Sequence, residues 1–299
     1  MKTGFVGIIG RPNVGKSTLL NTVLGEKIAI TTDKPQTTRN TIRGIYTHRD
    51  DEGGGVQMVF IDTPGIHRPR TKLGKYMTDS ATATLKEVDV IIFIVDGKLS
   101  DGPGDRYITE LLDSITTPKI LAINKIDKMP PDDFAEIYSQ YDELGIFEEI
   151  TGISAKEGTN VEELVAKTAE FMEEGPMYFP EDMITEHPER FIVSEIIREK
   201  ILMYLRDEVP HGVAVEIESF VEEDNVTKIG AVIYCEKKTH KGIIIGKGGR
   251  KLKGIGKSAR EEMEKLLGTK VFLEMWVKVR ENWRDSEAAL SSFGYKDGR

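Results

Sequence analysis

Three short segments, each at the end of an apolar run, combine residue types that suit phosphate, a divalent cation and a purine base. They are G10RPNVGKS17, D62TPG65 and N124KID127, and their first residues lie 52 and 62 positions apart. Each segment alone is a common loop sequence. Together, in this order, they predict one pocket for a guanine nucleotide.

The first segment matches the pattern G-x-x-x-x-G-K-[ST], and its flanks predict a strand at 5–9 and a helix at 18–24. Backbone N–H groups of such a loop, with the start of the helix, surround phosphate groups with positive dipoles. We expect Lys16 to reach the β and γ phosphates and Ser17 to bind Mg²⁺. A glycine-rich turn with an exposed lysine is the alternative, and the flanking elements disfavour it.

The second segment follows V56QMVFI61, which predicts a buried strand. Asp62 therefore lies at a strand end, where its carboxylate is expected to hold Mg²⁺ directly or through water. Gly65 has no Cβ, so its backbone N–H can approach the γ-phosphate closely. That contact would be lost when the phosphate leaves.

On these motifs, roughly residues 1–175 resemble a translation-factor-type GTPase of the Ras-like superfamily. The resemblance implies a doubly wound α/β sheet with the nucleotide at the carboxyl ends of the strands. Apolar runs near 5–9, 56–61, 89–95, 119–124 and 148–153, separated by amphipathic stretches of helical length, agree with this fold.

In this resemblance Asp127 accepts hydrogen bonds from the ring N–H and the exocyclic amine of guanine, which adenine cannot supply. We expect a buried carboxylate here, because an unpaired one would reject the wrong base. The implied nucleotide contacts come from Gly10, Arg11, Pro12, Asn13, Val14, Gly15, Lys16, Ser17, Thr18, Asp62, Thr63, Pro64, Gly65, Ile66, Asn124, Lys125, Ile126, Asp127, Ser154, Ala155 and Lys156.

The polar stretch T31TDKPQTTRN40 predicts a mobile loop, and its threonines resemble the switch that supplies a Mg²⁺ ligand. We favour Thr38 over Thr37, which gives Ser17, Thr38 and Asp62 as metal ligands. Lys16, Thr38 and Gly65 are the residues expected to act in catalysis. The alternative is a solvated loop.

Ile66 stands where Ras-type proteins have a glutamine that orients the attacking water. Because isoleucine cannot hydrogen-bond to water, we expect slow intrinsic hydrolysis. The water would then be positioned by the backbone, by another switch residue or by a partner. His67 is the nearest titratable candidate, although a lone loop histidine is more often a surface residue.

Composition predicts a soluble protein of a reducing, cytoplasmic compartment. The 299 residues exceed one nucleotide-binding domain, and the single Cys235 excludes an internal disulfide. The five scattered histidines give no readable zinc site. F5VGIIG10 is too short for a signal peptide, and V90IIFIV95 is too short to span a membrane.

Charge is unevenly distributed along the chain. The net charge is −9, and residues 1–180 carry 20 Lys and Arg against 28 Asp and Glu. Residues 237–260 carry nine Lys and Arg and no acid. Because the local field governs the docking of a phosphate backbone, this second segment is the candidate for nucleic acid.

Prolines and polar residues at 176–190 predict a linker after a helix that ends near Glu174. Beyond the linker, 192–208 has helical periodicity, and 213–220 and 227–235 alternate as strands do. I243II245 predicts a strand leading into the turn G246KGG249. The helix that follows would bury Leu252, Ile255, Ala259, Met263 and Leu266.

Glycines let a nucleic-acid backbone pass close to the turn, while the helix N-terminus and lysines supply positive charge. With a last strand at 271–279, residues 190–281 resemble a KH domain of the second type. A glycine-rich turn before a basic helix is the alternative. Trp283 and Tyr295 in the tail are expected to pack rather than stack on bases. The expected RNA contacts are Gly246, Lys247, Gly248, Gly249, Arg250, Lys251 and Lys253.

A Ras-like GTPase domain at 1–175, a linker at 176–190 and a KH domain with a tail at 191–299 together resemble the bacterial Era GTPases. Further strings support the resemblance: P35QTTR39, F179PEDMIT185, S194EIIREK200, L273EMWVKV279 and L290SSFGY295. It implies GTP, GDP and Mg²⁺ as ligands and the single-stranded 3′ end of small-subunit ribosomal RNA as partner. The implied role is in assembly of the small ribosomal subunit, and the protein is expected to be a monomer. Peripheral contact with the cell membrane is a secondary expectation.

We expect GTP and Mg²⁺ to order 31–40 and 62–75, which would change how the acidic domain packs on the basic one and so control the RNA groove. Three other classes remain open. An ATP-dependent kinase would not need N124KID127. A membrane-surface GTPase would show a continuous basic amphipathic face, and a binding module would exchange nucleotide without releasing phosphate.

Overall fold

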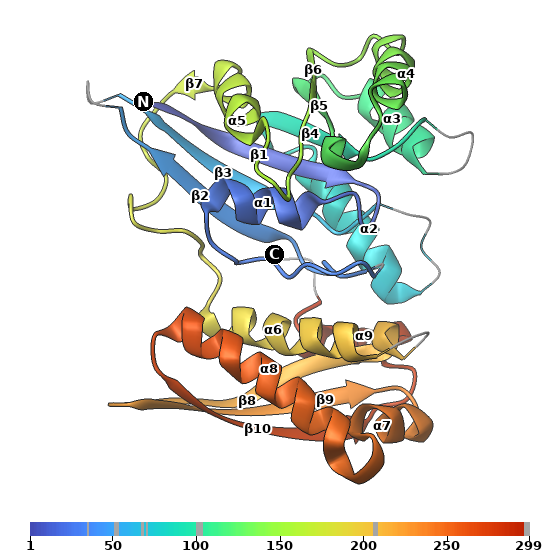
Figure 1. The fold of residues 1–299 in the computed structure, drawn as a ribbon, viewed down its shortest axis with the longest axis vertical. Helices are drawn as coiled ribbons and strands as arrows, with labels where there is room; N and C mark the ends of the chain where they lie inside the picture. Colours follow the sequence, from blue (N-terminus) through green and yellow to red (C-terminus); the bar gives the residue numbers. More distant parts are fainter. Residues whose placement is uncertain are drawn as a thin grey trace. The chain divides into compact units, whose positions relative to one another are not determined.

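The computed structural model describes residues 1–34, 36–50, 54–66, 69, 71–99, 104–205 and 209–295. The chain divides into two compact units, Met1–Arg70 with Gly74–Glu186, and Thr71–Leu73 with His187–Arg299. Each unit combines helices with a sheet, and the first sheet is largely parallel, as the sequence predicts (Figure 1). Within the described residues, no helix has the length and apolar character needed to cross a membrane.

The first unit is built on a central sheet in which the strands follow the order β2-β3-β1-β4-β5-β6, with a short β7 beside β1. Neighbours are parallel except at β2 and β7. Its elements are β1 (Lys2–Gly10), α1 (Lys16–Leu24), β2 (Ile42–His48), β3 (Val56–Asp62), α2 (Lys72–Thr84), β4 (Val90–Val95), α3 (Asp105–Asp113), β5 (Lys119–Ile123), α4 (Pro131–Asp142), β6 (Glu149–Gly152), α5 (Val161–Glu170) and β7 (Glu173–Glu174).

Helices cover both faces of this sheet (Figure 1). On one face, α2, α3 and α4 bury a continuous core against the strands, centred on Phe93 and Leu121. On the other face α1 packs beside α5. Strands buried on both sides read as unbroken apolar runs, and this is why V90IIFIV95 is recognisable from the sequence.

Strand β2 is absent from the sequence-based expectation. It pairs antiparallel with β3 at the edge of the sheet, from Ile42 opposite Asp62 to His48 opposite Val56. Only Ile42, Gly44 and Ile45 of this strand are buried. A half-exposed edge strand with a glycine and polar residues carries too weak an alternation to be predicted.

The chain between the two units docks along that edge. Ile45 N–H donates to Ile184 O at 2.7 Å, and Thr185 Oγ1 donates to Arg43 O at 2.7 Å. Beside this connector, the fully buried Gln57 accepts from Tyr178 N and Phe179 N and donates to Phe179 O. The first part of the expected linker is therefore a docked segment with defined hydrogen bonds.

The second unit has a three-stranded sheet in the order β10-β9-β8, in which β9 pairs antiparallel with β8 and parallel with β10. Helices α6 and α8 pack on one face of it through a single apolar core (Figure 1). Its elements are α6 (Glu189–Tyr204), β8 (Val213–Glu223), β9 (Val226–Cys235), α7 (Lys238–Ile245), α8 (Arg250–Leu267), β10 (Lys270–Val279) and α9 (Glu287–Ser292).

Two details of the second unit differ from the sequence-based expectation. The predicted strand at 243–245 is wrong, because these residues form the last turn of helix α7. Three consecutive isoleucines favour a strand locally, but Ile244 is buried in the helical core and tertiary packing decides. Leu266 is exposed rather than buried, and Leu267 packs against the core instead.

The tail packs as expected. Trp283 is fully buried and donates from Nε1 to Gly212 O at 2.9 Å. Tyr295 is also buried, with its ring stacked 6.0 Å from that of Trp283. These rings stabilise the second unit and are closed to base stacking.

Replacing Gln57 by Leu should free the connector from the sheet. Two backbone N–H groups and one carbonyl would lose their partner, at a cost of about 2 kcal/mol, so amide exchange across 177–186 should accelerate about 30-fold. Gln140→Leu is the matched control, since among the described residues its side chain accepts a single backbone bond, from Leu99 N. Unchanged exchange in Gln57→Leu, measured by mass spectrometry, would contradict this account of the connector.

Candidate functional site

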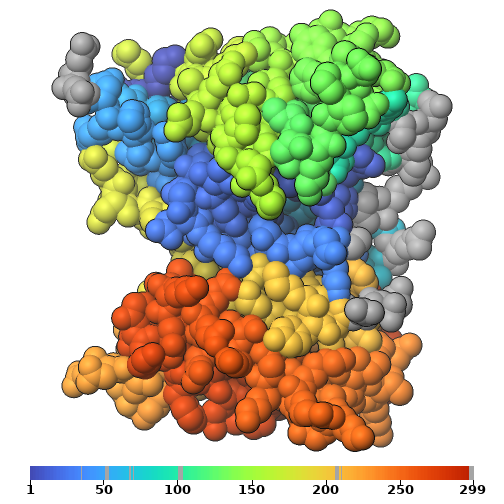
Figure 2. All heavy atoms as spheres, in the orientation of Figure 1, coloured from blue at the N-terminus to red at the C-terminus, as the bar shows by residue number. Residues whose placement is uncertain are grey.

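The carboxyl ends of β1, β3, β4, β5 and β6 meet at one edge of the first sheet and frame a cavity of about 360 Å³. Segments far apart in sequence meet there, as the blue and yellow-green atoms in the upper part of Figure 2 show. The predicted residues that line the cavity are Pro12, Asn13, Gly15, Lys16, Ser17, Thr18, Thr38, Gly65, Asn124, Lys125, Asp127, Ser154, Ala155 and Lys156.

Lys16 is the buried cation of this cavity. Helix α1 begins at this residue, and its ammonium donates to Gly10 O at 3.1 Å and to Arg11 O at 2.8 Å. Burial lowers the pKa of Lys16 to about 8, against the opposing attraction of Asp62 and Asp96. An incoming phosphate would supply the negative charge that this desolvated ammonium needs.

Three oxygens converge beside it. Ser17 Oγ donates to Asp62 Oδ2 at 2.6 Å and lies 2.8 Å from Thr38 Oγ1, which is itself 3.4 Å from Asp62 Oδ2. Burial raises the pKa of Asp62 to about 6, although Lys16 and both hydroxyls lower it. The other carboxylate oxygen, Oδ1, is buried and has no hydrogen-bond partner within the described part of the chain. Two hydroxyls and one carboxylate form the hard oxygen set that suits Mg²⁺.

The two switch threonines differ in orientation. Thr37 Oγ1 donates to Lys34 O at 2.6 Å and lies 2.6 Å from Thr32 Oγ1, so its hydroxyl serves the loop itself. The hydroxyl of Thr38 belongs to the group with Ser17 and Asp62. This geometry favours the sequence-based choice of Thr38 as the metal ligand.

At the opposite end, Asp127 lies on the rim of the cavity. Its Oδ1 accepts from Ser154 Oγ at 2.6 Å, and this bond lowers the pKa of the carboxyl. The expected burial is wrong, because Asp127 is exposed. It follows the end of β5, which raises the carboxylate to the rim, where a base would cover it.

The side chain of Asn124 forms hydrogen bonds to backbone groups around the cavity. The buried side chain donates from Nδ2 to Val14 O at 2.7 Å and accepts at Oδ1 from Ala155 N at 2.9 Å. One amide therefore ties the phosphate loop, the end of β5 and the S154AK156 segment together. Its role in the geometry is to position the two ends of the site.

The remaining predicted residues are not part of the cavity lining. Thr63 donates from Oγ1 to Ile8 O at 2.9 Å, and Ile66 is buried in the core under α2 and α3. The side chain of Ile66 is therefore enclosed in the core, and His67 lies outside the described residues. The predicted residues absent from the lining are Gly10, Arg11, Val14, Asp62, Thr63, Pro64, Ile66 and Ile126.

Some residues of the site were missed from the sequence. Thr31, Thr32, Gln36 and Lys128 line the cavity. Asp96 follows β4 and accepts from Lys125 Nζ at 2.5 Å. A polar residue directly after a buried strand was the signal used for Asp62 and Asn124, and it applied equally to Asp96.

The second unit presents the G246KGG249 turn between α7 and α8. Gly246, Gly248 and Gly249 have φ values of 71°, 61° and 73°, which favour glycine. Around this turn the side chains of Lys247, Arg250 and Lys253 are exposed, and Lys251 is half-buried. The predicted RNA-contact residues are thus together on a turn and the first helical turn after it.

Comparisons with known proteins agree on both units. A family model described as a 50S ribosome-binding GTPase matches residues 5–125, and a KH domain model matches residues 208–284. GTPase Era of Alkaliphilus oremlandii is 60% identical over 98% of this chain and 99% of its own length. GTPase Era of Clostridioides difficile is 56% identical over 99% of both chains.

Solved structures agree along the same length. A point variant of Aquifex aeolicus Era bound to GDP·AlF4⁻ has a TM-score of 0.93 and 40% identity, covering 99% of each chain. An Era structure with MgGDPNP and nucleotides 1506–1542 of 16S ribosomal RNA has a TM-score of 0.92 and 41% identity, again over 99% of each. With a guanine-nucleotide site of this geometry and a KH unit after it in the sequence, the chain belongs to the GTPase Era family.

Proposed function

We propose that this protein is a GTP-hydrolysing switch that binds the 3′ end of small-subunit ribosomal RNA and acts in assembly of the small ribosomal subunit, as a monomer in the cytoplasm. The observation that carries the proposal is a cavity lined at one end by Lys16 and Ser17, whose hydroxyl donates to the buried Asp62, and at the other end by Asp127. The two ends match the triphosphate with its metal and the guanine base.

Support for the RNA partner comes from a relative and from charge. The related Era structure holds nucleotides of 16S ribosomal RNA, which belongs to the small subunit. The description of the first family model names the 50S subunit, but that model matches only residues 5–125. The Era structure matches 99% of the chain, so we base the choice of RNA on it. In this chain, exposed Lys247, Arg250 and Lys253 surround a glycine turn that a phosphate backbone can approach.

For hydrolysis, the residues of this chain bind and orient the nucleotide. Lys16 would exchange its carbonyl partners for phosphate oxygens, and Ser17, Thr38 and Asp62 would hold Mg²⁺. When bound, Mg²⁺ would supply positive charge that offsets the negative charge developing on the phosphate oxygens. The buried Ile66 offers no group to the attacking water, so we propose a slow intrinsic rate and a water held by backbone, by another switch residue or by a partner.

We propose that the nucleotide state controls RNA affinity. The loop 31–40 contributes Thr38 to the group of metal-binding oxygens. GTP with Mg²⁺ would therefore hold this loop in place more firmly than GDP does. Linkage requires that RNA then strengthens GTP binding by the same factor. Peripheral membrane contact is the secondary expectation, and anionic lipid would compete for the same basic turn.

Asp127→Asn should invert the base preference from guanosine to xanthosine triphosphate. An amide donates where the carboxylate accepts, so the guanine N–H pair loses its acceptor, and the preference should shift by about 100-fold or more. Competition of GTP, XTP and ATP against a fluorescent nucleotide measures it. Asp132→Asn, at an exposed residue of helix α4, should keep the GTP preference. Retained GTP preference in Asp127→Asn would place the base elsewhere.

Thr38→Val should raise the Mg²⁺ concentration needed for GTP binding and slow hydrolysis about 10-fold or more, because the metal group loses a hydroxyl. Thr37→Val is the matched variant with the same change one residue away. It should leave the Mg²⁺ midpoint within about twofold, because its hydroxyl bonds within the loop. The reverse ranking in single-turnover assays would assign the metal to Thr37.

Replacing Lys247 and Lys251 by Gln should weaken binding of a single-stranded RNA of the 16S 3′ end about 10-fold and flatten its salt slope by about 0.7 per lysine. Lys265→Gln, near the far end of α8, is the control with an equal loss of charge per site.

Measured by anisotropy, wild-type RNA affinity should be higher with MgGDPNP than with GDP. Equal RNA affinities with MgGDPNP and with GDP would refute the coupling. If the Lys247 and Lys251 substitutions weakened binding to anionic vesicles but not to RNA, the basic turn would be assigned to lipid.

A further inference from the structure

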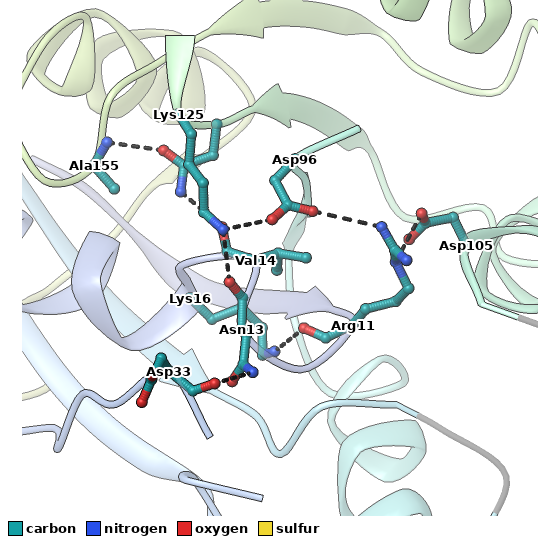
Figure 3. A network of polar contacts seen from close by, with 10 residues as sticks. Arg11, Asn13, Val14, Lys16, Asp33, Asp96, Asp105, Lys125 and Ala155 are labelled. Atoms are coloured by element: carbon teal, nitrogen blue, oxygen red, sulfur yellow. Dashed lines mark hydrogen bonds and ion pairs between the residues drawn. The ribbon is translucent and has the colours of Figure 1, made fainter. Parts of the chain in front are cut away.

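A charged network extends from the phosphate loop away from the cavity (Figure 3). The side chain of Arg11 does not line the cavity and turns toward α3, where its Nε lies 2.8 Å from Asp105 Oδ2. Its Nη2 lies 3.5 Å from Asp96 Oδ1. Asp96 in turn accepts from Lys125 Nζ, which also donates to Asn13 O of the phosphate loop.

Asp105 is the anchor of the network because it is fully buried at the start of α3. Exposed pairs such as Lys98 with Glu136 are screened by water and contribute little. A buried carboxylate is different, since removing its partner leaves an uncompensated charge in the interior. The Arg11–Asp105 contact is an ion pair whose Nε and Oδ2 lie 2.8 Å apart, with no well-aligned hydrogen bond to either atom among the described residues.

The backbone next to Arg11 follows from this pair. Arg11 O accepts from Lys16 Nζ at 2.8 Å, so the residue anchored by Asp105 also fixes the ammonium of the site. Gly104 leaves room for the anchored side chain, because a Cβ there would lie 2.8 Å from Arg11 Cδ. Gly104 has φ −86° and ψ −104°, which lies outside the regions that L-residues favour, so both packing and backbone conformation favour glycine at this position.

We propose that Asp105 is a positioning residue for nucleotide binding: by holding Arg11 it fixes the first residues of the phosphate loop and the reach of Lys16. It acts on the phosphate end alone, since Asp127 is oriented separately by Ser154. The inference rests on the proposed guanine-nucleotide site. Its signature is faster release of GDP with an unchanged choice of base.

The test uses the full chain loaded with fluorescent N-methylanthraniloyl GDP and follows its dissociation by stopped flow. Asp105→Asn and Arg11→Gln should each speed dissociation about 10-fold, within the coupling range of contacting residues. The double variant should be no faster than the faster single variant, because both remove one pair. Glu110→Gln, exposed on the same helix, should stay within about twofold of wild type.

Base choice separates this role from a general loss of structure. The ratio of GDP to XDP affinity should stay at the wild-type value in Asp105→Asn, whereas failure of the site itself would appear as an unaltered preference in Asp127→Asn. A wild-type dissociation rate in folded Asp105→Asn, an altered base ratio, or full additivity with Arg11→Gln would each overturn the proposal.

A second variant covers the case in which Asp105→Asn fails to fold. Gly104→Ala keeps both charges and crowds the Arg11 side chain at the start of α3, so it should also speed dissociation of the labelled GDP. Its base ratio should equal that of wild type. A wild-type dissociation rate in folded Gly104→Ala would overturn the proposal.

Discussion

The site depends on two opposite charges that are kept away from water, Lys16 at the start of helix α1 and Asp62 at the end of strand β3. Burial pushes the pKa of Lys16 down and that of Asp62 up, so each group resists its charged form. Because the pKa of Asp62 is raised in the folded state, the free energy of unfolding falls as pH rises from about 4 to about 6. Because the pKa of Lys16 is lowered, the free energy of unfolding also falls as pH drops from about 10 to about 8. At neutral pH both therefore favour a bound anion and cation, and the unfavourable burial of each charge is relieved when its ligand binds.

The rest of the first unit fixes the positions of these charges. Parallel strands end at one edge, so segments separated by more than a hundred residues meet there, and the Asn124 amide joins two of them through backbone groups. Such buried polar ties leave little freedom to the loops. The second unit supplies a different chemistry, an exposed basic turn whose glycines remove side chains from the path of a phosphate backbone.

Much of this arrangement was predictable because its determinants are local. The phosphate loop, the strand before it and the helix after it lie within about twenty residues, and buried strands read as apolar runs. What could not be predicted depends on tertiary partners. Helix α7 ends in three isoleucines that favour a strand, and the pairing of Arg11 with Asp105 joins residues 94 positions apart. Likewise, the motif N124KID127 does not specify that Asp127 is exposed, because exposure depends on the path of the chain after β5.

The docked connector has a consequence for solubility. An edge strand with free N–H and C=O groups is a template for a strand of another molecule. In β2, Ile184 O already accepts from Ile45 N, and Thr185 occupies Arg43 O. The segment that joins the two units thus also covers the sheet margin, and proteolytic cleavage within it would convert a folded protein into one prone to edge-to-edge aggregation.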